Sequence, residues 1–289
     1  MKKQTEDSNN HKISRRKFLG LGAAAFLGGV AVGSTYLYIN DESKEPVVEK
    51  VQIPIRTLPE SLEGFTIAIL SDFHLYPLTQ LPLIETAVVM TNALNPDLTV
   101  LLGDYVWHEV EAIFDLAPAL GKLNARHGIY CIMGNHDLWT NGDIVMQGLE
   151  EAHLPILRNE GTTIPAGKES LYLAGLDDGW SGNPDLTLAL ANREKNAATV
   201  LLMHEPDLAD KYALDDSIAL QLSGHSHGGQ IRFPYVGAII LPYLAWKYDM
   251  GLYKVKDLWL YTNRGLGVTN EPIRYNCAPE ITEITLIRA

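Results

Sequence analysis

Short apolar runs alternate with amphipathic stretches along the chain from Thr66 onward. Six runs are rich in valine, isoleucine and leucine and have the length of buried strands: Thr66–Leu70, Leu98–Leu102, Ile129–Met133, Leu171–Leu176, Val200–Met203 and Ala219–Leu222. Between the first three, apolar residues recur at helical spacing in Leu81–Leu94 and Ala112–Leu123. This succession predicts βαβ units and sheets covered by helices. Two later runs, Leu258–Thr262 and Ile281–Ile287, predict strands of a mixed or second sheet.

Five of the six apolar runs lead into a cluster of polar residues. The clusters are Ser71-Asp72-Phe73-His74, Gly103-Asp104, Gly134-Asn135-His136-Asp137, His204-Glu205 and Gly224-His225-Ser226-His227. A single such cluster is more often a turn, and a lone histidine more often belongs to the core. Ligands of α/β folds bind beyond the carboxyl ends of strands, however, and five clusters on one rim have the arrangement that a metal site needs.

The spacing within the clusters supports a metal site. In an extended chain, residues i and i+2 face the same side, so Asp72 and His74 can point at one ion, and His225 and His227 at a common centre. Glycines in these clusters let the backbone turn sharply and approach an ion closely. Mixed imidazole and carboxylate ligands suit Zn, Fe or Mn, whereas an all-oxygen set would suit Mg or Ca.

Residues 1–39 have the layout of an export signal. Residues 1–17 hold six basic and two acidic residues, a net charge of +4, and Phe18–Ile39 holds no charged residue. This is an n-region followed by an h-region. The junction Ser14-Arg15-Arg16-Lys17-Phe18-Leu19 resembles the twin-arginine consensus, for which paired arginines are diagnostic. We therefore expect the twin-arginine translocase as a partner and a location outside the cytoplasm, in the periplasm or cell wall.

The sequence leaves cleavage of this segment open. Ala31-Val32-Gly33 offers a small-x-small cleavage site. At about 1.5 Å per residue, Phe18–Ile39 also matches a hydrocarbon core of about 30 Å, so an uncleaved membrane anchor is the alternative. Residues 40–50 are charged and contain a proline, which predicts a linker. The catalytic domain is then expected over residues 51–289.

Composition narrows the classes of function. The chain of 289 residues is 46% hydrophobic, enough for one large domain or two small ones. Residues 1–45 carry a net charge of +2 within a total of −12, which leaves −14 on the rest. Such acidity repels nucleic acid, so no nucleic-acid partner is expected. Cys131 and Cys277 lack metal-ligand spacing and are expected to be reduced and structural. The absence of a P-loop and of a Gly-x-Ser-x-Gly elbow argues against NTPases and serine hydrolases.

Taken together and in order, the five clusters resemble the calcineurin-like metallophosphoesterase superfamily. Its pattern is Asp-x-His, Gly-Asp, Gly-Asn-His-Asp/Glu, His and Gly-His-x-His, and all five blocks occur between Asp72 and His227. The resemblance implies an α/β fold, a four-layer α/β/β/α sandwich in which two mixed sheets face each other. It also implies a binuclear centre of two divalent ions, Mn, Fe or Zn.

The resemblance further implies a role for each matching residue. One ion would take Asp72, His74 and His227, the other would take Asn135, His204 and His225, and Asp104 would bridge the two. His136 would act as an acid or stabilise the transition state, oriented by Asp137. Two such ions activate a water for in-line attack on phosphorus, so no covalent phospho-enzyme is expected. Trp107, shortly after the second cluster, is expected near the rim of the site.

Three further segments look like the bacterial membrane-associated branch of this superfamily: Arg264-Gly265-Leu266-Gly267, Pro272-Ile273-Arg274 and Asp177-Asp178-Gly179, the last of which also suits a plain turn. Some members of that branch resemble hydrolases of UDP-2,3-diacylglucosamine in lipid A synthesis. We therefore expect a phosphodiesterase or pyrophosphatase acting on a lipid- or envelope-linked substrate. UDP-sugar hydrolysis is cytoplasmic, however, whereas the signal predicts export.

The alternatives are a broad phosphomonoesterase or nucleotidase, and a non-catalytic membrane-tethered scaffold. The scaffold would lack metal ligands, and all of the expected ligands are present here.

Overall fold

The computed structural model describes residues 15–56, 58–195 and 197–289. Residues 1–14, which hold Lys2, Lys3 and Lys12 of the predicted basic region, lie outside the described residues. The chain divides into two compact units, Met1–Asp41 and Glu42–Ala289. In the first unit, Arg15–Ile39 forms helix α1. Among the helices of the described residues, none has both the length and the apolar character that a membrane span requires.

A five-stranded mixed sheet carries the first three polar clusters. Its strands, in spatial order, are β1 (Val47–Ile55), β13 (Glu280–Arg288), β2 (Thr66–Leu70), β3 (Leu98–Leu101) and β4 (Ile129–Cys131). Strands β2, β3 and β4 run parallel, β13 is antiparallel to β2, and β1 is parallel to β13. The parallel strands bring the clusters that follow them to the same edge.

A six-stranded mixed sheet carries the other two clusters. Its order is β11 (Gly251–Val255), β12 (Leu258–Thr262), β8 (Ile218–Ser223), β7 (Ala198–Leu202), β6 (Glu169–Gly175) and β5 (Glu160–Ala166). The four inner strands are parallel, and both edge strands are antiparallel to their neighbours. A small hairpin pairs β9 (Arg232–Phe233) with β10 (Gly237–Ala238).

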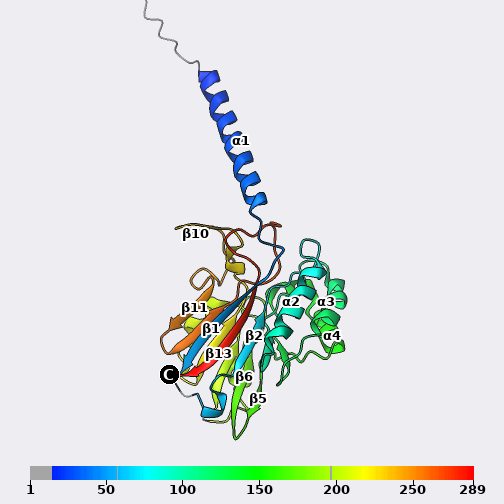
Figure 1. Ribbon diagram of the computed structural model, residues 1–289, viewed down its shortest axis with the longest axis vertical. Coiled ribbons are helices and arrows are strands. Elements are labelled where there is room, and N and C mark those ends of the chain that lie inside the picture. Colours follow the sequence, from blue (N-terminus) through cyan, green and yellow to red (C-terminus); the bar gives the residue numbers. More distant parts are fainter. Residues whose placement is uncertain (1–14, 57, 196) are drawn as a thin grey trace, which may run out of the picture. The chain divides into compact units, whose positions relative to one another are not determined.

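Three helices pack against the outer face of the five-stranded sheet, where Figure 1 shows them side by side: α2 (Leu81–Leu94), α3 (Ile113–Leu120) and α4 (Asn135–Glu151). The outer face of the six-stranded sheet packs against two single-turn helices, α5 (Leu186–Ala189) and α6 (Ala209–Tyr212). Short 3₁₀ turns occupy η1 (Glu60–Leu62), η2 (Val110–Ala112), η3 (Pro206–Leu208) and η4 (His227–Gly229). Within the described residues, the fourth layer of the expected sandwich is therefore thin.

The main core lies between the two sheets. Because side chains alternate along a strand, Ile67 and Ile69 point into this core, whereas Leu70 faces the helices. Leu173 and Leu222 meet them from the six-stranded sheet. Burying a side chain of this size contributes about 1.5–3 kcal/mol. The predicted α/β fold with two mixed sheets is confirmed, and β2, α2 and β12 have the predicted bounds.

One boundary needs correction. Residues 47–50, assigned above to the linker, belong to β1, which pairs with β13 along its whole length. Strand β1 is an edge strand whose residues are mostly half-buried or exposed, and Lys50 pairs with Glu283 at 2.7 Å. A charged edge strand lacks the apolar run on which the sequence argument relied. The two cysteines, Cys131 and Cys277, are buried and unpaired, as expected.

Candidate metal centre

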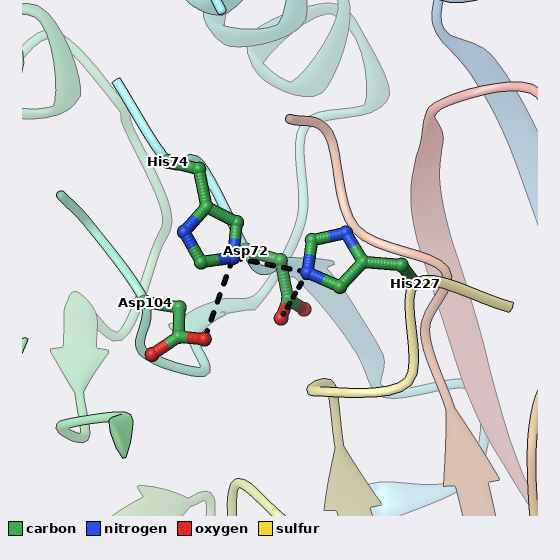
Figure 2. A group of neighbouring side chains, drawn as sticks. All are labelled: Asp72, His74, Asp104 and His227. Atoms are coloured by element: carbon green, nitrogen blue, oxygen red, sulfur yellow. Dashed lines mark hydrogen bonds and ion pairs between the residues drawn. The ribbon is translucent and has the colours of Figure 1, made fainter. Parts of the chain in front are cut away.

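The first group of candidate ligands joins residues from three clusters. The Nε2 atoms of His74 and His227 lie 2.9 Å apart. His74 Nε2 lies 3.4 Å from Asp104 Oδ2, and His227 Nε2 lies 3.4 Å from Asp72 Oδ1. Figure 2 shows all four side chains turned toward one centre. Each is buried, and one ligand atom from each lies within 4.8 Å of the others, so the four could hold an ion.

The second group consists of Asp104, His204 and His225, whose ligand atoms also lie within 4.8 Å of one another. His204 Nε2 lies 3.2 Å from Asp104 Oδ2. The Nδ1 atom of His204 bonds to the Leu102 carbonyl, and His225 Nε2 lies 2.7 Å from the Tyr243 carbonyl. A carbonyl only accepts, so these ring nitrogens carry protons, and the opposite nitrogens are the ones that can bind an ion once they are deprotonated. Asp104 thus belongs to both groups.

Asn135, the seventh predicted ligand, is the first residue of α4 and is 1% exposed. Neither its Oδ1 nor its Nδ2 has a hydrogen-bond partner in the described part of the chain. A buried amide without partners is rare in folded proteins and commonly marks the place of an absent ion or ligand. The candidate ligands together offer carboxylate, imidazole and amide oxygen donors, a set that fits a divalent transition metal.

His136 lies beside these groups without joining either. Its ring stacks on Trp107 at 4.2 Å between centroids, with 28° between the planes, and meets His74 edge-on at 4.8 Å. Its backbone N–H donates to Asp104 Oδ1 at 2.8 Å. Burial lowers the pKa of His136, against the opposing effect of the Asp104 carboxylate. The ring is thus held neutral and half-buried, where its N–H can meet a ligand.

The expected role of Asp137 is corrected by its contacts. Its carboxylate accepts hydrogen bonds from the backbone N–H groups of Gly134, Asp104 and Tyr105 at 2.8–2.9 Å, and not from the His136 ring. As the third residue of α4, it caps its own helix and ties that helix to the loop after β3. Asp137 therefore positions the loop that carries Asp104, and it acts on His136 only through the backbone.

The ligand side chains converge through left-handed backbone, which the sequence argument did not foresee. Five of the seven candidate ligands have positive φ: Asp72 (52°), His74 (43°), Asp104 (56°), His225 (69°) and His227 (52°). This conformation is uncommon outside glycine and costs about 1–2 kcal/mol per residue. Bonds between the loops hold it in place, because Asp72 N–H donates to Gly103 O and His225 N–H donates to the Asp72 carboxylate. The i, i+2 alternation of an extended strand is therefore not the cause.

Two glycines of the motifs are required by close packing. A Cβ on Gly134 would overlap the Asp104 carboxylate, and one on Gly224 would overlap the Ser71 hydroxyl and lie 2.5 Å from Asp72 Oδ2. The backbone of one cluster thus lies directly against a candidate ligand of another.

The electrostatics of the group separate His204 from the other histidines. Burial lowers the pKa of His74 and of His225 to about 3, and that of His227 well below its usual range, so all three are neutral at pH 7. Burial opposes a charge on His204, but the charge and hydrogen bond of Asp104, together with the charges of Asp72 and Glu205, outweigh it and raise the pKa of His204 well above its usual value. Without a metal, His204 therefore carries a proton in a charged pair with Asp104.

This difference predicts the proton balance of metal binding. A ligand must be deprotonated to bind. At pH 7 the proton to be lost is mainly that of His204, because Asp72, whose pKa burial raises to about 6, is mostly ionised. Filling the centre should release about one proton per chain, and the apparent affinity should fall about tenfold per pH unit of acidification. Titration calorimetry of the chelated protein in two buffers of different ionisation enthalpy measures this number. Release of three or four protons would contradict the assignment of neutral His74, His225 and His227.

The two glycine- and arginine-containing segments near the C-terminus contact the backbone of the loops that carry the candidate ligands. In Arg264-Gly265-Leu266-Gly267, the Gly267 N–H donates to Asp72 O at 2.7 Å. Arg274 is fully buried, and its guanidinium donates to the carbonyl oxygens of Gly267, Arg264 and Cys277. Its Nη1 also lies 3.4 Å from His227 O. These segments brace the loops that carry Asp72 and His227.

Asp177-Asp178-Gly179 forms a turn, as its alternative reading expected. Arg158 binds Asp177 through two nitrogens at 2.9 and 3.2 Å. Glu205, which follows His204, accepts from the N–H groups of Gly179 and Trp180 at 2.9 and 3.2 Å. The turn thus holds Trp180 beside the second ligand group.

Aromatic side chains around the mouth of the centre were not found by sequence reasoning. Trp180 lies edge-on to His225 at 5.8 Å and to Trp139 at 4.7 Å, and Trp107 meets His74 at 5.0 Å. Trp139 lies on helix α4 and the other two lie on separate loops, so the three form no sequence pattern and only Trp107 could be placed from its neighbourhood in the sequence.

A hollow of about 540 Å³ lies elsewhere, lined in part by Phe65, Asp97, Arg126 and His127. These residues precede β2, β3 and β4, so the hollow is at the amino ends of the strands. The candidate ligands follow the carboxyl ends, where α/β folds bind ligands.

Residues 65–229 match the family model described as calcineurin-like phosphoesterase. The chain is 37% identical over 286 residues to the uncharacterized metallophosphoesterase YkuE of Bacillus subtilis (strain 168), covering 95% of this chain and 98% of that protein. It is 30% identical over 279 residues to the phosphodiesterase YaeI of Escherichia coli (strain K12), covering 95% and 100%. A transmembrane protein with metallophosphoesterase domain of Danio rerio is 34% identical over 278 residues, covering 90% of this chain and 61% of that protein.

Proposed function

The chain belongs to the calcineurin-like phosphoesterases, and we propose that this metallophosphoesterase is exported and hydrolyses a phosphodiester or pyrophosphate bond in a lipid- or envelope-linked substrate. The observation that carries the proposal is the Asp104 carboxylate, which is common to two groups of candidate ligands. One side chain shared by two groups suits a pair of ions that act on one phosphate. The similarity to YaeI, a protein named as a phosphodiesterase, supports the choice of bond.

In this proposal Asp72, His74 and His227 hold one ion, Asn135, His204 and His225 hold the other, and Asp104 bridges them. The ions are Mn, Fe or Zn. When bound, they supply an activated water and positive charge for the phosphoryl oxygens. Arg274 keeps the His227 loop in place through its carbonyl contacts, and the protons on His204 Nδ1 and His225 Nε2 fix the ring orientations.

Among the side chains at the centre, His136 is the one that donates a hydrogen bond or a proton to the substrate. It is the half-buried imidazole beside both ligand groups, and Trp107 holds its ring by stacking at 4.2 Å. Its N–H is placed to stabilise charge that develops on a phosphoryl oxygen, or to reach the leaving oxygen.

Turnover of two chromogenic substrates tests this choice of bond. The holoenzyme should hydrolyse bis-(p-nitrophenyl) phosphate with a kcat/KM at least about tenfold above that for p-nitrophenyl phosphate. The reverse preference would identify a broad phosphomonoesterase or nucleotidase instead. Hydrolysis of neither substrate by protein carrying its metal would overturn the proposed function.

Export in folded form explains why a metalloenzyme would carry the Arg15-Arg16 pair. The proposed ligands span Asp72 to His227, so the centre forms only once the chain has folded. Folding before export lets the cytoplasm determine which metal is bound, away from tighter-binding Cu or Zn outside.

Replacing Arg15 and Arg16 by lysine should leave active, metal-loaded enzyme in the cytoplasm. Lysine keeps the charge but lacks the planar fork of the guanidinium. Phosphodiesterase activity is measured in separated cytoplasmic and extracytoplasmic fractions. A matched control replaces Lys2 and Lys3 by arginine, outside the motif, and should be exported normally. Unchanged export of the double-lysine variant would reduce residues 1–39 to an ordinary secretory signal or anchor.

A further inference from the structure

A row of aromatic rings leads away from the candidate metal centre. His136 meets Trp139 at 4.8 Å between ring centroids, and Trp139 meets Trp180 at 4.7 Å. Trp180 meets Tyr243 at 5.5 Å, and Tyr243 meets Trp246 at 6.0 Å. The last four rings are 40–67% exposed, so the row presents apolar surface to solvent.

The segment that carries the far end of this row is uncharged throughout. Phe233–Trp246 contains no acidic or basic residue, although the domain around it is strongly acidic. Its side chains include Ile239 and Ile240, which are 67% and 79% exposed. Single exposed apolar side chains are ordinary, but a continuous run of them on a soluble domain marks a binding surface.

This segment is fixed to the ligand motifs rather than hanging free. The Tyr243 carbonyl lies 2.7 Å from His225 Nε2. A Cβ added to Gly229, two residues after His227, would lie 2.8 Å from the Ile240 carbonyl. Asp207 accepts from the Trp246 N–H at 2.8 Å. The exposed side chains are therefore held at a fixed place beside the centre.

We propose that this surface, the apolar rim, holds the hydrocarbon part of an amphiphilic phosphodiester whose phosphate lies at the metal centre. The apolar rim consists of Trp139, Trp180, Tyr243, Trp246, Ile239 and Ile240. The inference rests on the proposed function and names the substrate class that the site selects.

The composition of the apolar rim favours hydrocarbon over other substituents. A nucleobase would stack on the aromatic rings, but the two isoleucines offer no ring face, and a net charge of −14 beyond residue 45 repels polynucleotides. A sugar or peptide would require polar groups. Among its side chains, Phe233–Trp246 offers only the hydroxyls of two tyrosines and the Trp246 indole N–H, which already donates to the Leu241 carbonyl. A chain of methylenes gains from both aromatic and aliphatic neighbours.

Alkyl p-nitrophenyl phosphodiesters of increasing chain length test the inference on the holoenzyme. Each methylene removed from water should lower KM by up to about fourfold. Because the apolar rim is open on one side, we expect a fall of about 30-fold or more from the methyl to the octyl ester. All esters are used below the concentration at which they form micelles.

Two variants and a matched control locate the effect. Ile240→Asn and Trp246→Ser should each cut the methyl-to-octyl ratio of KM values at least about threefold. Val89→Asn, on α2 and 69% exposed, removes a comparable apolar side chain outside the apolar rim and should leave the ratio as in the parent protein. Metal content and circular dichroism confirm that each variant is folded.

The outcomes separate the inference from the function on which it rests. Equal KM values for the methyl and octyl esters would overturn the inference and leave phosphodiester hydrolysis standing. A chain-length dependence that both variants retain would place the hydrocarbon elsewhere and overturn the apolar rim. Failure to hydrolyse any ester would overturn the proposed function itself.

Discussion

Asp104→Asn should leave a folded protein that binds fewer than two ions per chain and hydrolyses no phosphodiester at a measurable rate. Asp104 Oδ2 lies 3.4 Å from His74 Nε2 and 3.2 Å from His204 Nε2, so one carboxylate serves both candidate groups. Asparagine keeps a side-chain oxygen that can accept from the backbone N–H of His136, but it removes the negative charge that two ions would share. Asp104→Ala should have the same effect on metal and lose that N–H partner as well.

Metal analysis and bis-(p-nitrophenyl) phosphate turnover measure this outcome together. The matched control is Asp97→Asn, a buried carboxylate at the opposite ends of the strands, which binds Arg126 at 2.7 Å and touches no candidate ligand. It should retain both ions, whatever it does to stability. Two ions bound to Asp104→Asn would rule out the bridging role.

His136→Gln should keep both ions and lose about 10²–10⁴-fold in kcat, the range expected when a positioned proton donor is removed. The ring lies beside the two groups without belonging to either, so its loss removes no proposed ligand. Glutamine can still donate a hydrogen bond but cannot carry or release the proton. The measurements are metal content and kcat for bis-(p-nitrophenyl) phosphate.

His108→Gln is the control for this change. His108 also packs against Trp107, with 4.7 Å between the ring centroids. It is exposed and belongs to neither ligand group. Its replacement should change kcat less than about threefold. If His136→Gln loses a metal ion, His136 is a ligand and the division of roles at this centre is wrong.

The elements that position the site were largely predictable, because each is a short apolar run with a polar cluster after it. Strand β2 and helix α2 have the bounds that their hydrophobic patterns predict. Strand β1 was missed because an edge strand with charged residues lacks that pattern. Helix α4 was not predicted, since its first turn coincides with the third polar cluster and hides its start.

The residues of the candidate site were found from their order, but their geometry was not. Asp72 and His74 lie in one group, and His225 and His227 lie in different groups, because left-handed backbone turns each side chain separately. The alternation of side chains along a strand assumes extended backbone, so it cannot predict where these side chains point. Asp137 shows the same limit, since its bonds run to backbone N–H groups of another loop.

Features that arise only from contacts between distant parts of the chain leave no recognisable pattern in the sequence. Trp139, Trp180 and Tyr243 come from α4, a turn after β6 and the segment after β10, and they meet only in the folded domain. Arg274 is fully buried, against the ordinary preference of arginine. Its role depends on carbonyl groups that a sequence does not display.

The claim that this phosphoesterase uses two ions is tested most directly by measuring its activity as a function of the number of ions bound per chain. Protein freed of metal by chelation is titrated with Mn²⁺, Fe²⁺ or Zn²⁺, and each sample is assayed for bound ions per chain and for hydrolysis of bis-(p-nitrophenyl) phosphate. A two-ion centre should give negligible turnover with no ion, and full turnover only as the number of ions approaches two. Full activity of the metal-free chain, or a plateau at one ion, would contradict it.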